Sequence, residues 1–173
     1  MVGDYGNLLW RLLPLARQVL KPNGALYLFS RFDVSPEWWL MLGNYFRPKN
    51  RLIWVKNNHG MGDLDGNWAG QYEEILFAVK GRHKLQNGRP SNVLYANKVP
   101  KERQRHVAEK PVEIMLPLIE ASCPVGGVVL DPCAGTGPVV EAAERLGRDC
   151  IAIEINPDHC DTIERRMGQG VLL

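Results

Sequence analysis

The chain has 173 residues, of which 45% are hydrophobic and 23% charged, a composition typical of one globular domain spanning residues 1–173. No apolar run approaches the roughly 18–20 residues of a membrane-spanning helix, and the N-terminus carries no basic-then-apolar signal pattern. These features argue against a membrane protein and a secreted protein. The four cysteines form no CxxC pair. We therefore expect reduced thiols in a cytoplasmic protein, with neither a zinc site nor disulfides.

The net charge of +2 is distributed unevenly along the chain. Residues 80–110 contain nine Lys or Arg and two Glu, a net charge of +7, whereas the remainder carries −5. A basic block in an otherwise acidic chain indicates a polyanionic partner. A solvated loop is the alternative interpretation of such a run.

The first two thirds of the chain predict a mixture of helices and strands. Apolar residues at helical spacing predict a helix over 7–20, with Pro14 as a kink. Ser35 and Pro36 predict the start of a second helix, with the serine as its cap. Strands are expected at 25–30, 51–56 and 74–79, a loop over the basic block, and a helix over 111–122 that is bent at Pro117.

The last third alternates strands and helices. Strands are expected at 127–131 and 150–154, each followed by a helix, at 138–146 and 157–167. Asn156 is the predicted cap of the second of these helices. Near-continuous apolar strands in this alternation predict an α/β fold with a mostly parallel sheet and helices on both faces.

A glycine-containing loop, DPCAGTG at 131–137, follows the first of these two strands. Gly135 and Gly137 allow a ligand to approach the backbone closely, and Thr136 offers a hydroxyl group. Glu154 ends the next strand, where a carboxylate can accept hydrogen bonds from both hydroxyls of a ribose. The pattern predicts an adenosine-containing cofactor. A tight turn beside a solvated strand end is the alternative.

Two details argue against a nicotinamide cofactor. Val140 occupies the third glycine position of a GxGxxG motif. The carboxylate of Asp131 would repel a pyrophosphate, whereas it would attract the amino group and the sulfonium of S-adenosylmethionine. S-adenosylmethionine is therefore the predicted cofactor, and a nicotinamide oxidoreductase is a distant alternative.

Several segments, in order, resemble the DNA amino-methyltransferases that modify adenine N6 or cytosine N4. The loop 131–137 resembles the first cofactor motif of this family, and HVAEKP at 106–111 resembles its His-x-x-x-Lys-Pro signature. Further similar segments are VLKPNG at 19–24, IWVKNN at 53–58, YEEILFA at 72–78, GR at 147–148, IAIEI at 151–155 and IERRM at 163–167. The resemblance covers nearly the whole chain.

The resemblance implies a class I methyltransferase-like (Rossmann-like) fold and transfer of a methyl group from S-adenosylmethionine to an amino nitrogen of a flipped base in DNA. It implies a cofactor site formed by Lys110, Pro111, Asp131, Pro132, Cys133, Gly135, Thr136, Gly137 and Glu154. Cys133 stands where the family usually has Phe. Residues 80–105 would be the DNA-facing recognition loop, with Arg82, Lys84, Arg89, Lys98, Lys101, Arg103 and Arg105 as the DNA-binding residues.

The catalytic motif of the family, (Asp/Asn/Ser)-Pro-Pro-aromatic, does not occur in these 173 residues, which contain no Pro-Pro pair. The nearest matches, SPEW at 35–38 and NPDH at 156–159, are better explained as helix starts. We therefore assign no catalytic residue and expect a chain that is incomplete at its N-terminus. It would be a fragment, one half of a split enzyme that needs a complementary N-terminal polypeptide, or a degenerate copy. A non-catalytic DNA-binding or regulatory subunit is the alternative.

Two further groups of residues have open interpretations. Trp54 and the segment 56–58 would contact the flipped base by resemblance, or else Trp54 is a core residue and Lys56 a solvated strand end. His59 and His83 lack partners at metal-ligand spacing, so no metal site is expected.

Overall fold

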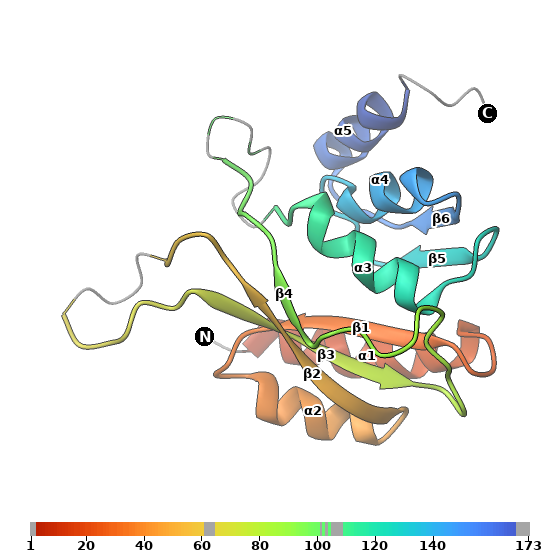
Figure 1. Ribbon diagram of the computed structural model, residues 1–173, viewed down its shortest axis with the longest axis horizontal. Helices are drawn as coiled ribbons and strands as arrows, with labels where there is room; N and C mark the ends of the chain where they lie inside the picture. The colour runs from red at the N-terminus through yellow and green to blue at the C-terminus, as the bar shows by residue number, and fades with distance from the viewer. Residues whose placement is uncertain (1–2, 61–64, 101, 103, 105–108, 169–173) are drawn as a thin grey trace. The chain divides into compact units, whose positions relative to one another are not determined.

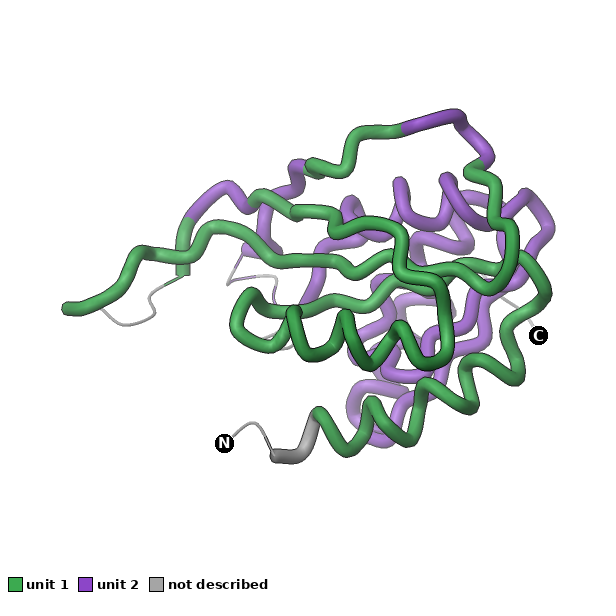
Figure 2. Tube along the Cα trace, turned by 90° about the horizontal axis from the view of Figure 1, so that it is seen from below, with its two compact units in different colours: residues 1–55, 59–85, 90–94 green, residues 56–58, 86–89, 95–173 purple. Residues whose placement is uncertain are grey.

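The computed structural model describes residues 3–60, 65–100, 102, 104 and 109–168. The chain forms two compact units (Figure 2), and each is described by itself. Unit 1 comprises residues 1–55, 59–85 and 90–94, and unit 2 comprises residues 56–58, 86–89 and 95–173. The basic block at 80–105 is therefore divided between the two units.

Unit 1 is built on a four-stranded sheet with the order β1-β3-β2-β4 (Figure 1). Its strands are β1 (Ala25–Ser30), β2 (Arg47–Val55), β3 (Tyr72–Val79) and β4 (Val93–Tyr95). The central strand β3 is antiparallel to both β1 and β2. In this register Val79 pairs with Ala25 and with Arg47, so that the start of β1, the start of β2 and the end of β3 lie together.

Two helices, α1 (Gly3–Val19) and α2 (Ser35–Gly43), supply much of the apolar core of unit 1. Leu9 and Leu13 lie one turn apart on α1 and are buried with Met41 and Leu42 of α2. They pack with Leu76 and Ala78, which alternate along β3 and therefore face the same side of the sheet. Pro14 lies inside α1.

Unit 2 contains the parallel strand pair β5 (Val128–Asp131) and β6 (Asp149–Ala152). Its helices are α3 (Val112–Ser122), α4 (Pro138–Arg145) and α5 (Pro157–Met167). The alternation predicted for this region is confirmed, because β5, α4, β6 and α5 follow one another along the chain. Asn156 caps α5, since its side chain accepts a hydrogen bond from the backbone N–H of Asp158 at 3.0 Å.

The strand directions differ from the mostly parallel sheet that the sequence suggested. Parallel pairing is found for β5 and β6, whereas the pairs β1–β3 and β2–β3 are antiparallel. Near-continuous apolar strands predict parallel pairing, but a central antiparallel strand that is buried on both faces has the same pattern. Residues 74–79 of β3 are all buried. The short strand β4 was expected to be part of a loop. No helix among the described ranges is long and apolar enough to span a bilayer.

Candidate functional site

The loop between β5 and α4 is fixed to the chain that follows β6 by backbone hydrogen bonds. The N–H of Ala134 donates to the carbonyl of Ile153 at 3.0 Å, and the N–H of Ile153 donates to the carbonyl of Asp131 at 2.9 Å. Inside the loop, the N–H of Gly137 donates to the carbonyl of Ala134 at 2.9 Å. Asp131 and Glu154, separate in sequence, are thereby held at one end of the parallel strand pair.

The two glycines of the loop have different roles. Both have positive φ angles, 54° for Gly135 and 81° for Gly137, a region that L side chains rarely adopt. A Cβ atom on Gly137 would lie 2.8 Å from Cγ1 of Ile163, so this glycine also lets α5 pack against the loop. A Cβ atom on Gly135 would meet no atom within 4 Å. The open space at Gly135 is therefore the place where a ligand can approach the backbone.

Glu154 is not a solvated strand end. Its Oε2 accepts a hydrogen bond from the N–H of Gly135 at 2.7 Å, and its Oε1 accepts from the N–H groups of Ile155 at 3.0 Å and Asn156 at 2.9 Å. Burial raises the pKa of Glu154. The three hydrogen bonds together, with a smaller contribution from His159, lower the pKa by more than burial raises it, so that the net shift is downward. The carboxylate is therefore held ionised at the glycine loop.

Replacing Glu154 by Gln is expected to make stability less dependent on acid. Because the folded-state pKa of Glu154 lies below the ordinary value of 4.5, its contribution is present above that value and is lost as pH falls through the folded-state pKa. Urea unfolding at pH 7 and pH 3.5 should show a deficit in the variant that shrinks at the lower pH. Glu144→Gln, at an exposed position on α4, is the control. An equal deficit at both pH values would contradict the assignment.

Asp131 has the opposite electrostatic character. Burial raises the pKa of its carboxyl group, the hydrogen bond from the N–H of Cys133 to Oδ1 at 3.1 Å lowers it by less, and the charge of Glu154 adds a still smaller increase. Its ionised form is thus poorly compensated at neutral pH. A cationic ligand would supply the missing compensation.

The thiols near the loop stay protonated. Burial raises the pKa of Cys133, and the neighbouring Asp131 and Glu154 raise it further. The pKa of Cys150 is raised to about 11 by burial and by Asp131. Both are unsuited to nucleophilic chemistry at neutral pH.

Arg166 of α5 is a buried connection that the sequence analysis missed. Its guanidinium donates to the carbonyl of Thr136 at 2.7 Å, lies 3.6 Å from Oε1 of Glu109, and pairs with Glu141 of α4. The side chain of Arg166 is 13% exposed and that of Glu109 only 2%. One arginine therefore joins the glycine loop, α4, α5 and the chain before α3. The sequence gives one indication of this role: Arg166 follows Ile163 by three residues, so that both side chains lie on the same face of α5.

The hydroxyl group of Thr136 is buried and has no hydrogen-bond partner in the part of the chain that the structure describes. The predicted residues Lys110 and Pro111 directly follow Glu109, and Pro111 is the buried cap residue of α3. Of the nine predicted cofactor residues, the loop residues lie beside Glu154, because hydrogen bonds join the loop to Ile153 and Glu154. Lys110 and Pro111 belong to the same unit and directly follow Glu109, whose ion pair with Arg166 connects this part of the chain to the glycine loop.

The predicted DNA-binding residues that the structure describes are divided between the two units. Arg82 and Lys84 belong to unit 1, whereas Arg89 and Lys98 belong to unit 2. Lys101, Arg103 and Arg105 lie outside the described residues.

The near match to a catalytic motif at 35–38 has a structural role. The hydroxyl of Ser35 is buried and bonds to the carboxylate of Glu74, which also lies 3.9 Å from the guanidinium of Arg51. The predicted capping by Ser35 is wrong in detail, because Val34 is the cap residue of α2 and no side chain caps the helix. The serine hydroxyl donates a hydrogen bond to the charged acceptor Glu74 and does not accept one from a backbone N–H of the helix.

Trp54 and the segment 56–58 were the residues with two possible interpretations, as base contacts or as structural residues. Trp54 is 2% exposed and is a core residue. The side-chain oxygen of Asn57 accepts a hydrogen bond from the N–H of Lys98 at 3.0 Å. Among the described residues, no group of three or more His, Cys, Asp or Glu is placed to hold a metal ion.

A glycine loop joined to an acidic strand end in an α/β unit is typical of folds that bind nucleoside cofactors, and the similar solved structures identify the fold as class I methyltransferase-like. A family model for DNA methylases of the N6/N4 type matches residues 2–165, and the chain belongs to this family. It is 26% identical to the type II methyltransferase M2.LlaDCHI of Lactococcus lactis subsp. cremoris over 92% of this chain and 66% of that protein. It is 27% identical to M2.DpnII of Streptococcus pneumoniae over 88% of this chain and 63% of that protein.

Among solved structures, the fold is similar to that of the M1.HpyAVI–SAM complex, with a TM-score of 0.82. The similarity covers 95% of this chain and 84% of that chain, at 24% sequence identity. Of the two curated relatives, by contrast, the chain spans only part of the length, 66% of M2.LlaDCHI and 63% of M2.DpnII.

Proposed function

We propose that this chain provides the cofactor-binding part of a DNA methyltransferase that acts on the exocyclic amino group of adenine or cytosine. The observation that carries the proposal is the juxtaposition of Asp131, Glu154 and the open backbone at Gly135. Family membership supports the reaction class.

The residues of the loop fit S-adenosylmethionine in charge and in shape. Asp131 would face the positively charged methionyl end, because its ionised carboxylate lacks compensation in the free protein. Glu154 would accept hydrogen bonds from the ribose hydroxyls with the lone pairs that its backbone donors leave over. Gly135 leaves space where a side chain would block the ligand. When bound, S-adenosylmethionine supplies an activated methyl group, and the residues of this chain hold and orient it.

The chain is proposed to act together with a complementary polypeptide. The register of β5 and β6 places Val128, Leu130 and Ile151 on one face of the strand pair, where they are 48%, 42% and 56% exposed. Ile153, two residues beyond Ile151, is 54% exposed. An exposed apolar strip of this kind marks a surface that another polypeptide covers. A polypeptide that carries the (Asp/Asn/Ser)-Pro-Pro-aromatic segment absent from these 173 residues is the proposed occupant.

The non-catalytic alternative is a DNA-binding or regulatory subunit, favoured by the absence of that segment. Two measurements separate the possibilities. Calorimetry with S-adenosylmethionine should show one-site binding to the chain alone. Transfer of a tritiated methyl group to plasmid DNA is expected only after addition of a polypeptide that contains a strand followed by the catalytic segment.

Three results would count against the proposal. Absence of cofactor binding would remove its basis, and labelling of DNA by the chain alone would refute the need for a second polypeptide. Cofactor binding without labelling in the reconstituted mixture would favour the regulatory alternative.

A further inference from the structure

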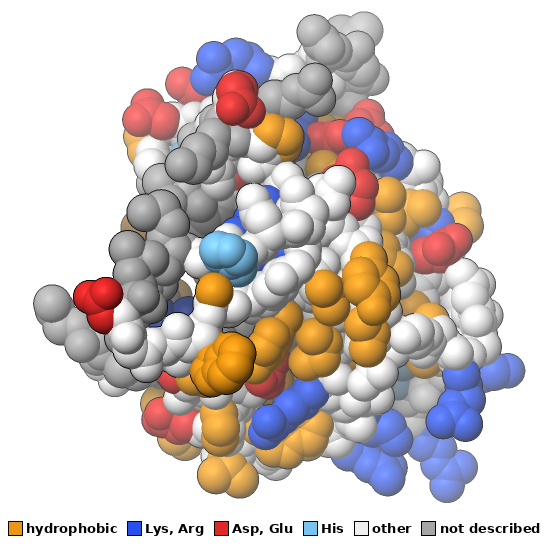
Figure 3. All heavy atoms as spheres, turned by 60° about the vertical axis from the view of Figure 1, so that its left-hand side comes forward, with side chains coloured by type: hydrophobic (Ala, Val, Ile, Leu, Met, Phe, Trp, Pro, Cys, Tyr) orange, Lys and Arg blue, Asp and Glu red, His pale blue; other side chains and the backbone are white. Residues whose placement is uncertain are grey.

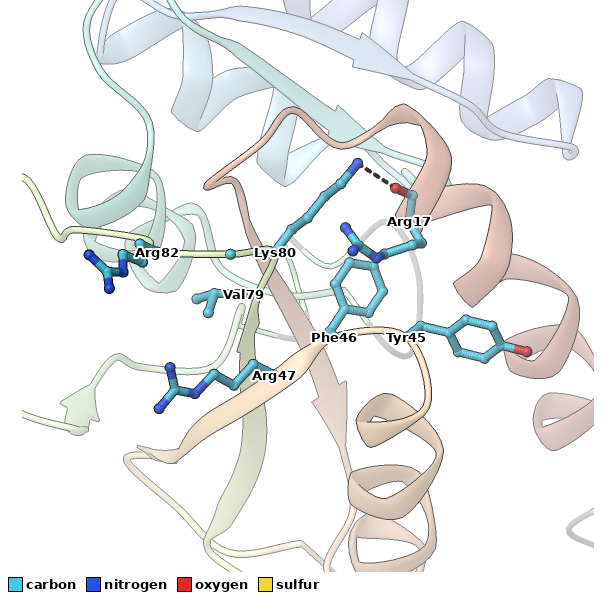
Figure 4. A pocket seen from close by; sticks show the side chains of 8 residues that line it. Arg17, Tyr45, Phe46, Arg47, Val79, Lys80 and Arg82 are labelled. Carbon is cyan, nitrogen blue, oxygen red and sulfur yellow. Dashed lines mark hydrogen bonds between the residues drawn. The ribbon is translucent and has the colours of Figure 1, made fainter.

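A basic cleft lies in unit 1, at the end of the sheet where β1 begins and β3 ends (Figure 4). It has a volume of about 410 Å³. It is lined by Arg17, Tyr45, Phe46, Arg47, Val79, Lys80, Gly81 and Arg82. Three segments distant in sequence therefore contribute cations to one place: the end of α1, the start of β2 and the turn after β3.

Among the described residues, no Asp or Glu lines the basic cleft. The three contributing segments, 14–24, 43–52 and 79–92, contain no Asp or Glu. They carry further cations beyond the cleft lining, at Lys21, Lys49 and Lys84. Figure 3 shows a group of Lys and Arg side chains at the lower right of the face that it presents.

The cleft arginines also lack the partners that other arginines of unit 1 have. Arg31 pairs with Asp33 at 2.6 Å, and Arg51 lies 3.9 Å from Glu74. Among the described residues, no ion pair or hydrogen bond engages the guanidinium groups of Arg17, Arg47 and Arg82. Three exposed guanidinium groups beside one cleft repel one another unless an anion lies between them.

The backbone around the cleft is firmly fixed. The ammonium group of Lys80 donates to the carbonyls of Arg17 at 2.7 Å and Leu20 at 2.6 Å, which joins the turn after β3 to the end of α1 (Figure 4). Asn23 has a φ of 64°, which is uncommon outside glycine, and its side chain accepts a hydrogen bond from the N–H of Arg82 at 2.8 Å. A Cβ atom on Gly81 would lie 2.7 Å from that side-chain oxygen. The turn that presents Arg82 is thus a defined conformation.

We propose that the basic cleft binds phosphate groups of the DNA backbone. The proposal rests on the proposed function in that DNA is the substrate. Guanidinium groups match phosphate oxygens in geometry and charge. The further cations at Lys21, Lys49 and Lys84 extend the charge past the cleft, as suits a continuous polyanion better than a small phosphorylated ligand. Arg17 and Arg47 lie outside the basic block of the sequence, so the charge distribution along the chain does not indicate them.

The test compares two triple variants of the full chain that lose the same charge. The cleft variant carries Arg17→Gln, Arg47→Gln and Arg82→Gln, and the control carries Arg11→Gln, Arg145→Gln and Arg165→Gln at exposed positions elsewhere. Fluorescence anisotropy with a duplex oligonucleotide is measured over a range of salt concentrations. The cleft variant should bind on the order of 10- to 100-fold more weakly at low salt, and the slope of log K against log[salt] should fall by about 2–3, since each phosphate contact contributes about 0.9.

The control should keep most of the slope. Equal slopes for the two variants would overturn the proposal. Tight binding of inorganic pyrophosphate that requires the three cleft arginines, with an unchanged DNA slope, would also overturn it in favour of a small anion. Calorimetry with S-adenosylmethionine is run in parallel. Absence of cofactor binding would contradict the proposed cofactor site, whereas the DNA measurement would still test the basic cleft independently.

Discussion

Replacing Arg166 by Met is expected to lower the free energy of unfolding of this chain by about 3–5 kcal/mol, the usual cost of removing one partner of a buried ion pair. The methionine fills most of the volume but removes the cation that lies 3.6 Å from Oε1 of Glu109, whose side chain is 2% exposed, and that also pairs with Glu141. It also leaves the carbonyl of Thr136 without a donor. The loss should appear in urea unfolding followed by circular dichroism.

The adjacent residue provides a matched control. Arg165 is exposed, and its guanidinium donates to the backbone carbonyl of Asp161 on its own helix at 3.0 Å. Arg165→Met should change stability by less than about 0.5 kcal/mol, as is usual for surface substitutions. Similar losses in the two variants would mean that Arg166 acts only as a general helix residue.

Replacing Asp131 by Asn is expected to separate stability from ligand affinity. The raised pKa of Asp131 means that its ionised form is disfavoured in the folded protein, so its contribution becomes less favourable as pH rises through the folded-state pKa. The neutral amide removes this penalty and can still accept the hydrogen bond from Cys133. The free variant should therefore be at least as stable as the wild type at pH 7.

Its affinity for S-adenosylmethionine should nevertheless fall by about 10- to 100-fold, because a hydrogen bond to a charged group contributes about 1.5–3 kcal/mol. Calorimetry measures the affinity and thermal unfolding the stability of the same samples. Asp149→Asn, at the exposed start of β6, is the control and should alter neither quantity appreciably. An unchanged affinity in Asp131→Asn would refute the role of this carboxylate in binding a cationic group.

The parts of the fold that local sequence determines were predictable. The alternation at 127–167 is confirmed within one or two residues at each end, because apolar runs bounded by Gly, Asn and Pro leave few alternatives. Strand β4 was missed, since three residues give no periodicity and its pairing with β2 is decided by distant chain. The hydrogen bond from Ser35 to Glu74 spans 39 residues, and nothing near Ser35 indicates it.

In the candidate site, too, some features were predictable from the sequence and others depend on contacts between distant segments. Asp131 and Glu154 were predictable because strand ends in a parallel pair meet at one edge, so their spacing alone brings them together. The hydrogen bonds that Glu154 accepts from three backbone N–H groups depend on the exact path of the loop. Arg166 was missed because its partners come from three separate segments. The basic cleft was missed for a similar reason, since charge counted along the chain ignores Arg17 and Arg47.

The contact of Gly137 with Ile163 has a consequence for how the family can vary. Since the last helix rests directly on the loop backbone, a bulkier residue at either position would push the two apart. Substitutions at Ile163, 26 residues after Gly137, are therefore expected to change the conformation of the glycine loop. A smaller residue at position 163 would not by itself make a side chain at position 137 acceptable, because the positive φ of Gly137 would remain.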